Sequence, residues 1–200
     1  IGIQMKKYLL LIILMVTGIT GIRAQYDSQL SQYFMAMGYY NPAYAGVRED
    51  LNLLALSRLQ WIGIEGAPKS FFIHADMPFK LGKTNHGVGL LIFTEGIGLF
   101  QNTHVNLQYA YKQKLLGGTL SAGLQFGLVN QSFNGEKVFY PTSQFHQQQD
   151  QAIPNVQVSG MGMDIGAGLY YTHKKFYVGL GITHLNKAEV RLDEYSSMYL

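Results

Sequence analysis

The side chains best suited to chemistry are two histidines and an aspartate. His74 and Asp76 lie two residues apart in segment 71–77, and His104 lies in a second segment that could form a nearby strand. Imidazole and carboxylate groups in this arrangement point to a metal site or an acid–base pair. A spacing of two also puts both side chains on one face of a strand, as in the polar interior of a barrel. We favour the polar cluster and expect neither a metal nor a cofactor.

A lipid-cleaving enzyme is the second chemical possibility. It would need a serine activated by a histidine and oriented by a third group. Ser57, Ser70 and Ser121 are present together with several histidines, but the sequence contains no G-x-S-x-G nucleophile elbow. Its Gly-x-Gly pairs never complete the dinucleotide pattern G-x-G-x-x-G. We therefore predict that the protein is not an enzyme and has no catalytic residues.

These residues belong to segments in which apolar side chains recur with a period of two. In 102–112, Thr103, Val105, Leu107, Tyr109 and Tyr111 alternate with Asn102, His104, Asn106, Gln108 and Ala110. Similar alternation marks 51–61, 71–77, 87–92, 120–129, 161–171 and 176–183. We expect each segment to belong to a strand of roughly ten residues, which matches the 9–11 that a tilted strand needs to cross a bilayer, whereas soluble strands are usually shorter. The pattern predicts an all-β, transmembrane, antiparallel up-and-down β-barrel with about seven strands in residues 51–200.

The connections between these segments alternate in character. Residues 80–85, 113–118 and 172–175 are short and polar, whereas 63–69, 94–98 and the long 130–159 lie at the other end. Outer-membrane barrels have short periplasmic turns and longer external loops, which predicts the orientation. Segment 130–159 is either a solvated loop or a recognition loop. Because such barrels close with an even number of strands, we expect this chain to be a C-terminally truncated part of a longer protein.

The N-terminus predicts export. Lys6 and Lys7 precede an apolar run at 8–20 and a small residue at Ala24, which is typical of a secretory signal peptide over 1–24, with residues 1–4 upstream of the true start. The alternative, a membrane anchor or buried helix, is disfavoured because about fifteen residues are short for a span. Removing Lys6, Lys7 and Arg23 leaves twelve basic and twelve acidic side chains. This scattered, balanced charge argues against a nucleic-acid partner. The absence of cysteine excludes disulfides.

Two motifs in the next segment, 25–50, resemble a known family. Ser31, Gln32 and Tyr33 form the first motif, and the second consists of Asn41, Pro42, Ala43, Tyr44, Ala45 and Gly46. Together with 57–61 and 67–70, they resemble the start of the PorP/SprF family of type IX secretion system membrane proteins from Bacteroidetes. Family members are longer than this chain, in keeping with the expected truncation.

The resemblance implies an outer-membrane β-barrel component of the type IX secretion system in a Gram-negative bacterium. Such a component would support secretion or surface attachment of cargo proteins such as gliding adhesins. Its expected partners are other secretion components on the periplasmic side, secreted cargo and outer-membrane lipid. The alternative is a porin or a transporter of hydrophobic solutes, in which the polar inner face would line a path. Residues 25–50 would lie in the periplasm before the barrel, and their motif residues would either pack there or dock a partner.

Overall fold

The computed structural model describes residues 30–138, 156–186, 189–193 and 196–199. The predicted signal peptide and residues 139–155 of the long loop lie outside these ranges. Helical structure in the described part is confined to α2 (Met37–Tyr40) and two 3-10 turns, η1 (Pro42–Tyr44) and η2 (Gly135–Lys137). No helix in the described part is long and apolar enough to cross a membrane.

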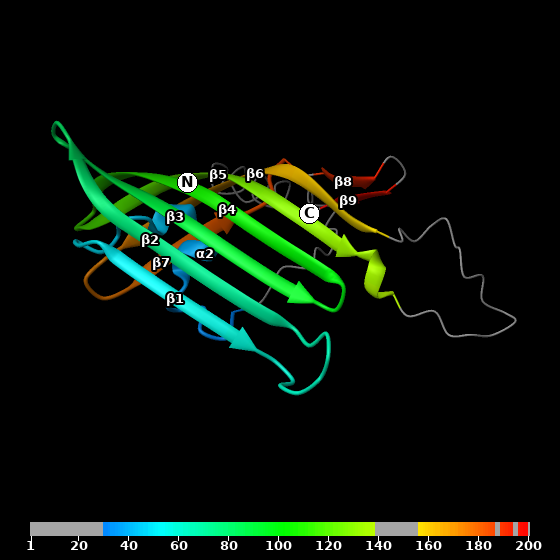
Figure 1. Cartoon of the computed structure of the whole chain (residues 1–200). Helices are drawn as coiled ribbons and strands as arrows, with labels where there is room; N and C mark the ends of the chain where they lie inside the picture. The colour runs from blue at the N-terminus through cyan, green and yellow to red at the C-terminus, as the bar shows by residue number, and fades with distance from the viewer. Residues whose placement is uncertain (1–29, 139–155, 187–188, 194–195, 200) are drawn as a thin grey trace, which may run out of the picture.

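Seven consecutive strands form one antiparallel sheet that curls into a half-barrel (Figure 1). The strands are β1 (Asn52–Leu59), β2 (Lys69–Leu81), β3 (Thr84–Ile97), β4 (Phe100–Leu115), β5 (Gly118–Asn134), β6 (Gln157–Thr172) and β7 (Tyr177–Ile182). Each strand pairs with the next, so the predicted all-β, up-and-down fold with seven strands is confirmed. A separate hairpin of β8 (Glu189–Asp193) and β9 (Ser196–Tyr199) follows, in a stretch for which the sequence predicted no strand.

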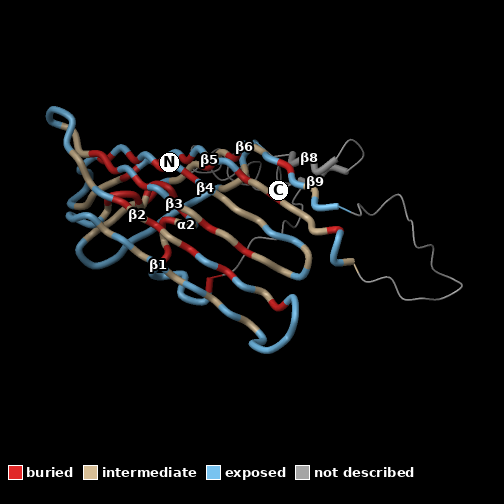
Figure 2. The backbone as a smooth tube through the Cα atoms, in the orientation of Figure 1, coloured by how far each residue is buried: buried red, intermediate tan, exposed pale blue. Residues whose placement is uncertain are grey.

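The sheet is apolar outside and polar inside. Along β4, Val105, Leu107, Tyr109 and Tyr111 are exposed on the convex face, whereas Asn106, Gln108, Ala110 and Lys112 are buried on the concave face. Figure 2 shows the same alternation of buried and exposed positions along the neighbouring strands. The other buried polar side chains of the concave face include His74, Asp76, Ser121, Gln125, Gln131 and Asp164. This distribution is the one expected of a wall with hydrocarbon on its convex side.

The central strands are longer than the predicted ten residues. Strands β2 to β6 have 13 to 17 residues. The difference arises at their ends, where polar residues such as Gln101 and Lys114 continue the ladder beyond the apolar stretch. Hydrophobic alternation therefore identified only the part of each strand suited to a hydrocarbon layer.

The predicted loop at 94–98 is wrong because strand pairing there also continues beyond the apolar stretch. Residues 94–97 belong to β3 and pair with β4, so the connection there is only Gly98 and Leu99. Gly98 has a φ of 59°, the left-handed conformation that tight hairpins require. The hairpin between β4 and β5 is equally short, with positive φ at Leu116 and Gly117. The wider connections, 60–68 and 135–156, both lie at the end opposite the β4–β5 hairpin.

Candidate functional site

The space enclosed by the curled sheet holds the N-terminal segment of the described chain. Residues 30–47, here called the inner segment, include α2 and η1, and residues 36–46 of this segment lie within this space (Figure 1). Leu30 and Ala36 join Phe72, Leu91 and Phe93 in a small hydrophobic cluster. The Tyr39 ring lies 5.8 Å from that of Phe72 and 5.3 Å from that of Phe93. The inner segment is thus packed against the wall.

The wall receives this segment through a row of small residues that crosses five strands. Gly87 pairs with Ala110, Ala110 with Gly123, Gly123 with Gly168, and Gly168 with Gly181. This small-residue row runs roughly perpendicular to the strands, because each member faces its partner directly across the ladder. Without large side chains the row allows another backbone to approach the concave face closely.

The inner segment follows the row in order. A Cβ on Gly181 would overlap the Tyr40 carbonyl, and one on Gly123 would overlap the Ala43 backbone. At the other end, a Cβ on Gly87 would overlap the Ala45 carbonyl. Side chains on the row would therefore collide with residues 40–45, and glycine is needed for this close backbone approach.

Asn41 fixes the segment to the two last strands of the half-barrel. Its Nδ2 donates to the Leu169 carbonyl at 3.0 Å and to the Leu180 carbonyl at 3.2 Å. Its Oδ1 accepts from the Ala43 N–H at 2.9 Å, which caps η1. Pro42 suits the first position of that turn because it needs no N–H donor there. One buried amide thus joins a local turn to β6 and β7.

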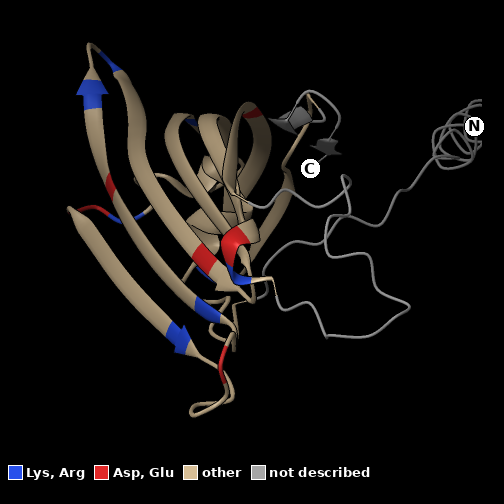
Figure 3. Ribbon diagram, turned by 45° about the vertical axis from the view of Figure 1, so that its right-hand side comes forward, with Lys and Arg blue, Asp and Glu red and all other residues tan. Residues whose placement is uncertain are grey.

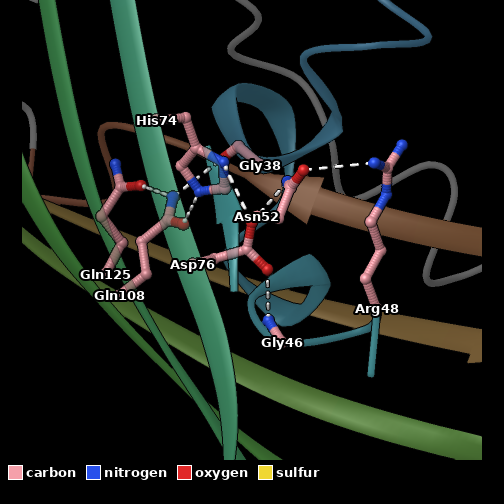
Figure 4. A network of polar contacts seen from close by, with 8 residues as sticks. All are labelled: Gly38, Gly46, Arg48, Asn52, His74, Asp76, Gln108 and Gln125. Carbon is pink, nitrogen blue, oxygen red and sulfur yellow. Dashed lines mark hydrogen bonds and ion pairs between the residues drawn. The ribbon is translucent and has the colours of Figure 1, made fainter. Parts of the chain in front are cut away.

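Asp76 fixes the segment near its C-terminal end (Figure 4). One carboxylate oxygen accepts from the Gly46 N–H at 2.7 Å, and the other accepts from Asn52 Nδ2 at 2.8 Å. Asn52 in turn accepts from Arg48 at 3.1 Å. Gly46 has a φ of 65°, and a Cβ there would meet the Met77 carbonyl oxygen at 2.8 Å. Glycine is therefore required both for the turn and for the contact with β2.

A second group of polar contacts lies beside Asp76 (Figure 4). Gln108 Nε2 donates to the Gly38 carbonyl at 2.6 Å and to Gln125 at 2.8 Å. Its Oε1 lies 3.1 Å from His74 Nε2, and His74 Nδ1 lies 3.4 Å from Asp76. These hydrogen bonds link three strands to α2, so the polar interior holds the inner segment by specific pairing.

The structure separates the residues that the sequence grouped by chemistry. His74 and Asp76 face the concave side together. His104 has other neighbours: the centre of its ring lies 6.0 Å from that of Phe93 and 6.3 Å from that of His184. His184 instead pairs with Asp164 at 2.9 Å, beside a cavity of about 340 Å³ next to β7. Within the described ranges, no three His, Cys, Asp or Glu side chains are placed to hold a metal ion. Ser70 is one of the serines considered for a lipid-cleaving enzyme, and its hydroxyl donates to the Glu95 carboxylate at 2.9 Å.

The two sequence motifs have different environments. Asn41, Pro42, Ala43, Ala45 and Gly46 are buried against the wall, and Tyr44 is partly buried. Ser31, Gln32 and Tyr33 lie in an exposed turn. The small-residue row and the His184–Asp164 pair are additions that sequence reasoning missed. Glycine alternation was visible, but the strand register that aligns the row was not.

A curled antiparallel sheet with an apolar convex face and a polar, filled concave face is typical of membrane β-barrel proteins. The family model described as "Type IX secretion system membrane protein PorP/SprF" matches residues 22–200. The chain therefore belongs to the PorP/SprF family, and it is a membrane component of the type IX secretion system. Searches of curated proteins and of solved structures gave no match to this chain.

Proposed function

We propose that this protein is an outer-membrane scaffold of the type IX secretion system that supports secretion or surface attachment of cargo proteins, such as gliding adhesins. The wall anchors the protein in lipid, the end with the β4–β5 hairpin meets machinery components in the periplasm, and the opposite end meets cargo. No covalent step is needed for this role.

The observation that carries the proposal is the filled concave side. A porin or solute transporter needs a continuous polar path, whereas here residues 40–45 lie in contact with the wall across five strands. Asn41 and Gly46, which border the stretch that follows the row, are both held to the wall by hydrogen bonds. A wall that binds its own chain so closely favours anchoring over conduction.

The proposal includes export through a signal peptide at residues 1–24 and residence in the outer membrane, with residues 25–50 reaching the wall from the periplasm. Membrane residence is supported by large exposed apolar side chains, such as Met163 at 71% and Leu107 at 64% exposure. Monomeric soluble proteins rarely expose contiguous apolar faces of this kind.

Replacing Leu107 with arginine tests the lipid-facing wall. We expect Leu107→Arg to lower the free energy of folding into liposomes by about 2 kcal/mol, because a cation on the lipid face must be desolvated. Leu116→Arg is the matched control, since Leu116 lies in the β4–β5 turn and is 85% exposed. Urea titration with a heat-modifiability gel measures both variants. Equal stability of the two would argue against a lipid-facing convex surface.

Affinity purification from outer membranes tests the scaffold role. The full-length protein carrying a tag should co-purify periplasmic secretion components, and its deletion should remove cargo from the cell surface. An unrelated tagged outer-membrane barrel of similar size serves as the control. Planar-bilayer recordings of the same preparation should show no stable conductance. Ion conductance without co-purifying secretion components would instead favour the porin or transporter.

A further inference from the structure

A large cavity opens at the end of the half-barrel that carries the β2–β3, β4–β5 and β6–β7 connections. Its volume is about 1200 Å³, and it is bounded by the loop after Gly46, the end of β2, the β4–β5 hairpin and the β6–β7 connection. It is separate from the small-residue row, which the inner segment already fills. The cavity lies on the concave side, so the wall shields it from the lipid-facing surface.

The cavity is strongly basic. Its lining includes the cations Arg48, Lys80, Lys112, Lys114 and Lys174, whereas Glu49 is the only carboxylate that lines it. Within the described ranges, none of these five cations forms a salt bridge with an Asp or Glu. Figure 3 shows little charge along most of the strand length, with Lys and Arg mainly near strand ends. Five of these basic side chains line the same cavity at one end of the sheet.

Lys112 is the most informative of these residues. It is only 7% exposed, and its ammonium group has neither a hydrogen bond nor a salt bridge to any other described residue. Asp76 attracts it through space, but both Asp76 oxygens already accept hydrogen bonds from Gly46 and Asn52. The ammonium group reaches the cavity, where its three donors can bind an occupant in place of water. An anion in the cavity would satisfy them.

We propose that this cavity binds an acidic, extended peptide segment of a partner protein. The volume exceeds the range of about 300–1000 Å³ usual for small-molecule sites, so a single phosphate or carboxylate would leave most of it empty. The cations come from four separate parts of the chain, a spacing that suits several carboxylates along one strand of peptide. The partner's location in the periplasm rests on the function proposed above, whereas the anion chemistry rests on the cavity alone.

Fluorescence anisotropy with a labelled hexaglutamate peptide tests this proposal, using the full-length protein in detergent micelles. We expect saturable binding at 0.15 M salt that weakens strongly at 1 M, where the screening length falls from about 8 Å to about 3 Å. Lys112→Gln should weaken binding by about 30-fold, because it removes a buried cationic partner. Lys112→Arg should retain binding. Lys69→Gln, an exposed change at the opposite end of the sheet, is the matched control.

Stability separates binding from a structural role of Lys112. Lys112 forms no salt bridge with a described residue, so Lys112→Gln should leave resistance to urea about unchanged, and weaker binding would not reflect unfolding. Equal binding of hexaserine, or unchanged affinity in Lys112→Gln, would overturn the proposal. Displacement of the peptide by equimolar inorganic phosphate would do so too, by assigning the cavity to a small anion. If peptide binding fails while secretion components still co-purify, only this inference falls; the reverse result removes the scaffold role alone.

Discussion

Replacing Gly87 and Gly123 with valine should expel the inner segment from the wall. We expect the double variant to lose about 4 kcal/mol of unfolding free energy, at about 2 kcal/mol for each overpacked position. The collision is with backbone atoms, because a Cβ on Gly87 would overlap the Ala45 carbonyl and one on Gly123 the Ala43 backbone. Backbone held on both sides cannot turn away as a flexible side chain could.

The direction of the change in unfolding free energy distinguishes a filled concave side from an empty one. Valine favours strands, whereas glycine weakens them, so the same substitutions would raise stability if the concave side were empty. Gly96→Val is the matched control in β3, since no atom lies within 4 Å of a Cβ there. We expect this control to be neutral or stabilising. A double variant as stable as Gly96→Val would show that the inner segment does not occupy the row.

Single-cysteine labelling tests whether the inner segment leaves the wall in the valine double variant. The protein contains no cysteine, so Ala43→Cys introduces a unique thiol at a fully buried position. Maleimide should label it slowly in the parent and much faster in the valine double variant. Ser31→Cys, in the exposed turn, should react rapidly in both backgrounds. Slow labelling of Ala43→Cys in both would mean that the segment stays seated.

The sequence predicted the wall well because the wall obeys a local rule. Side chains of residues 102–112 alternate between lipid-facing and inward positions, so the faces of Leu107 and Gln108 could be read from neighbours two residues away. The N-terminal motif was recognisable as well. Its contacts were not, because the Asn41 partners lie more than 100 residues away in sequence, on β6 and β7.

Long-range register explains the other differences. Gly87, Gly123 and Gly168 look alike as isolated glycines in alternating segments, and they form one row only when three pairings align them. The partner of Asp164 also depended on tertiary placement, since His184 follows β7 and has a φ of 54°. Hydrophobic periodicity carries no information about either feature. Residues 94–97 lie beyond the apolar alternation, so the sequence predicts a loop there, although these residues pair with β4 throughout.

Replacing Asn41 with aspartate should be the most damaging one-residue change in the inner segment. The substitution keeps an oxygen that can cap Ala43, but it turns Nδ2 into an oxygen facing the Leu169 and Leu180 carbonyls. Two hydrogen bonds are lost, and a buried negative charge meets two carbonyl dipoles. We expect a loss of about 4 kcal/mol in unfolding free energy at neutral pH. Asn41→Ala, which adds no charge, should lose less.

Urea unfolding followed by circular dichroism at two pH values tests this explanation. Lowering the pH protonates the new carboxylate, which removes its charge and restores one O–H donor. The deficit of Asn41→Asp relative to the parent should therefore shrink as the pH falls. Asn85→Asp is the matched control, because Asn85 is partly exposed and lines the basic cavity. If both variants unfold like the parent at neutral pH, Asn41 does not anchor the segment, and the filled interior that supports the scaffold role loses its main attachment to β6 and β7.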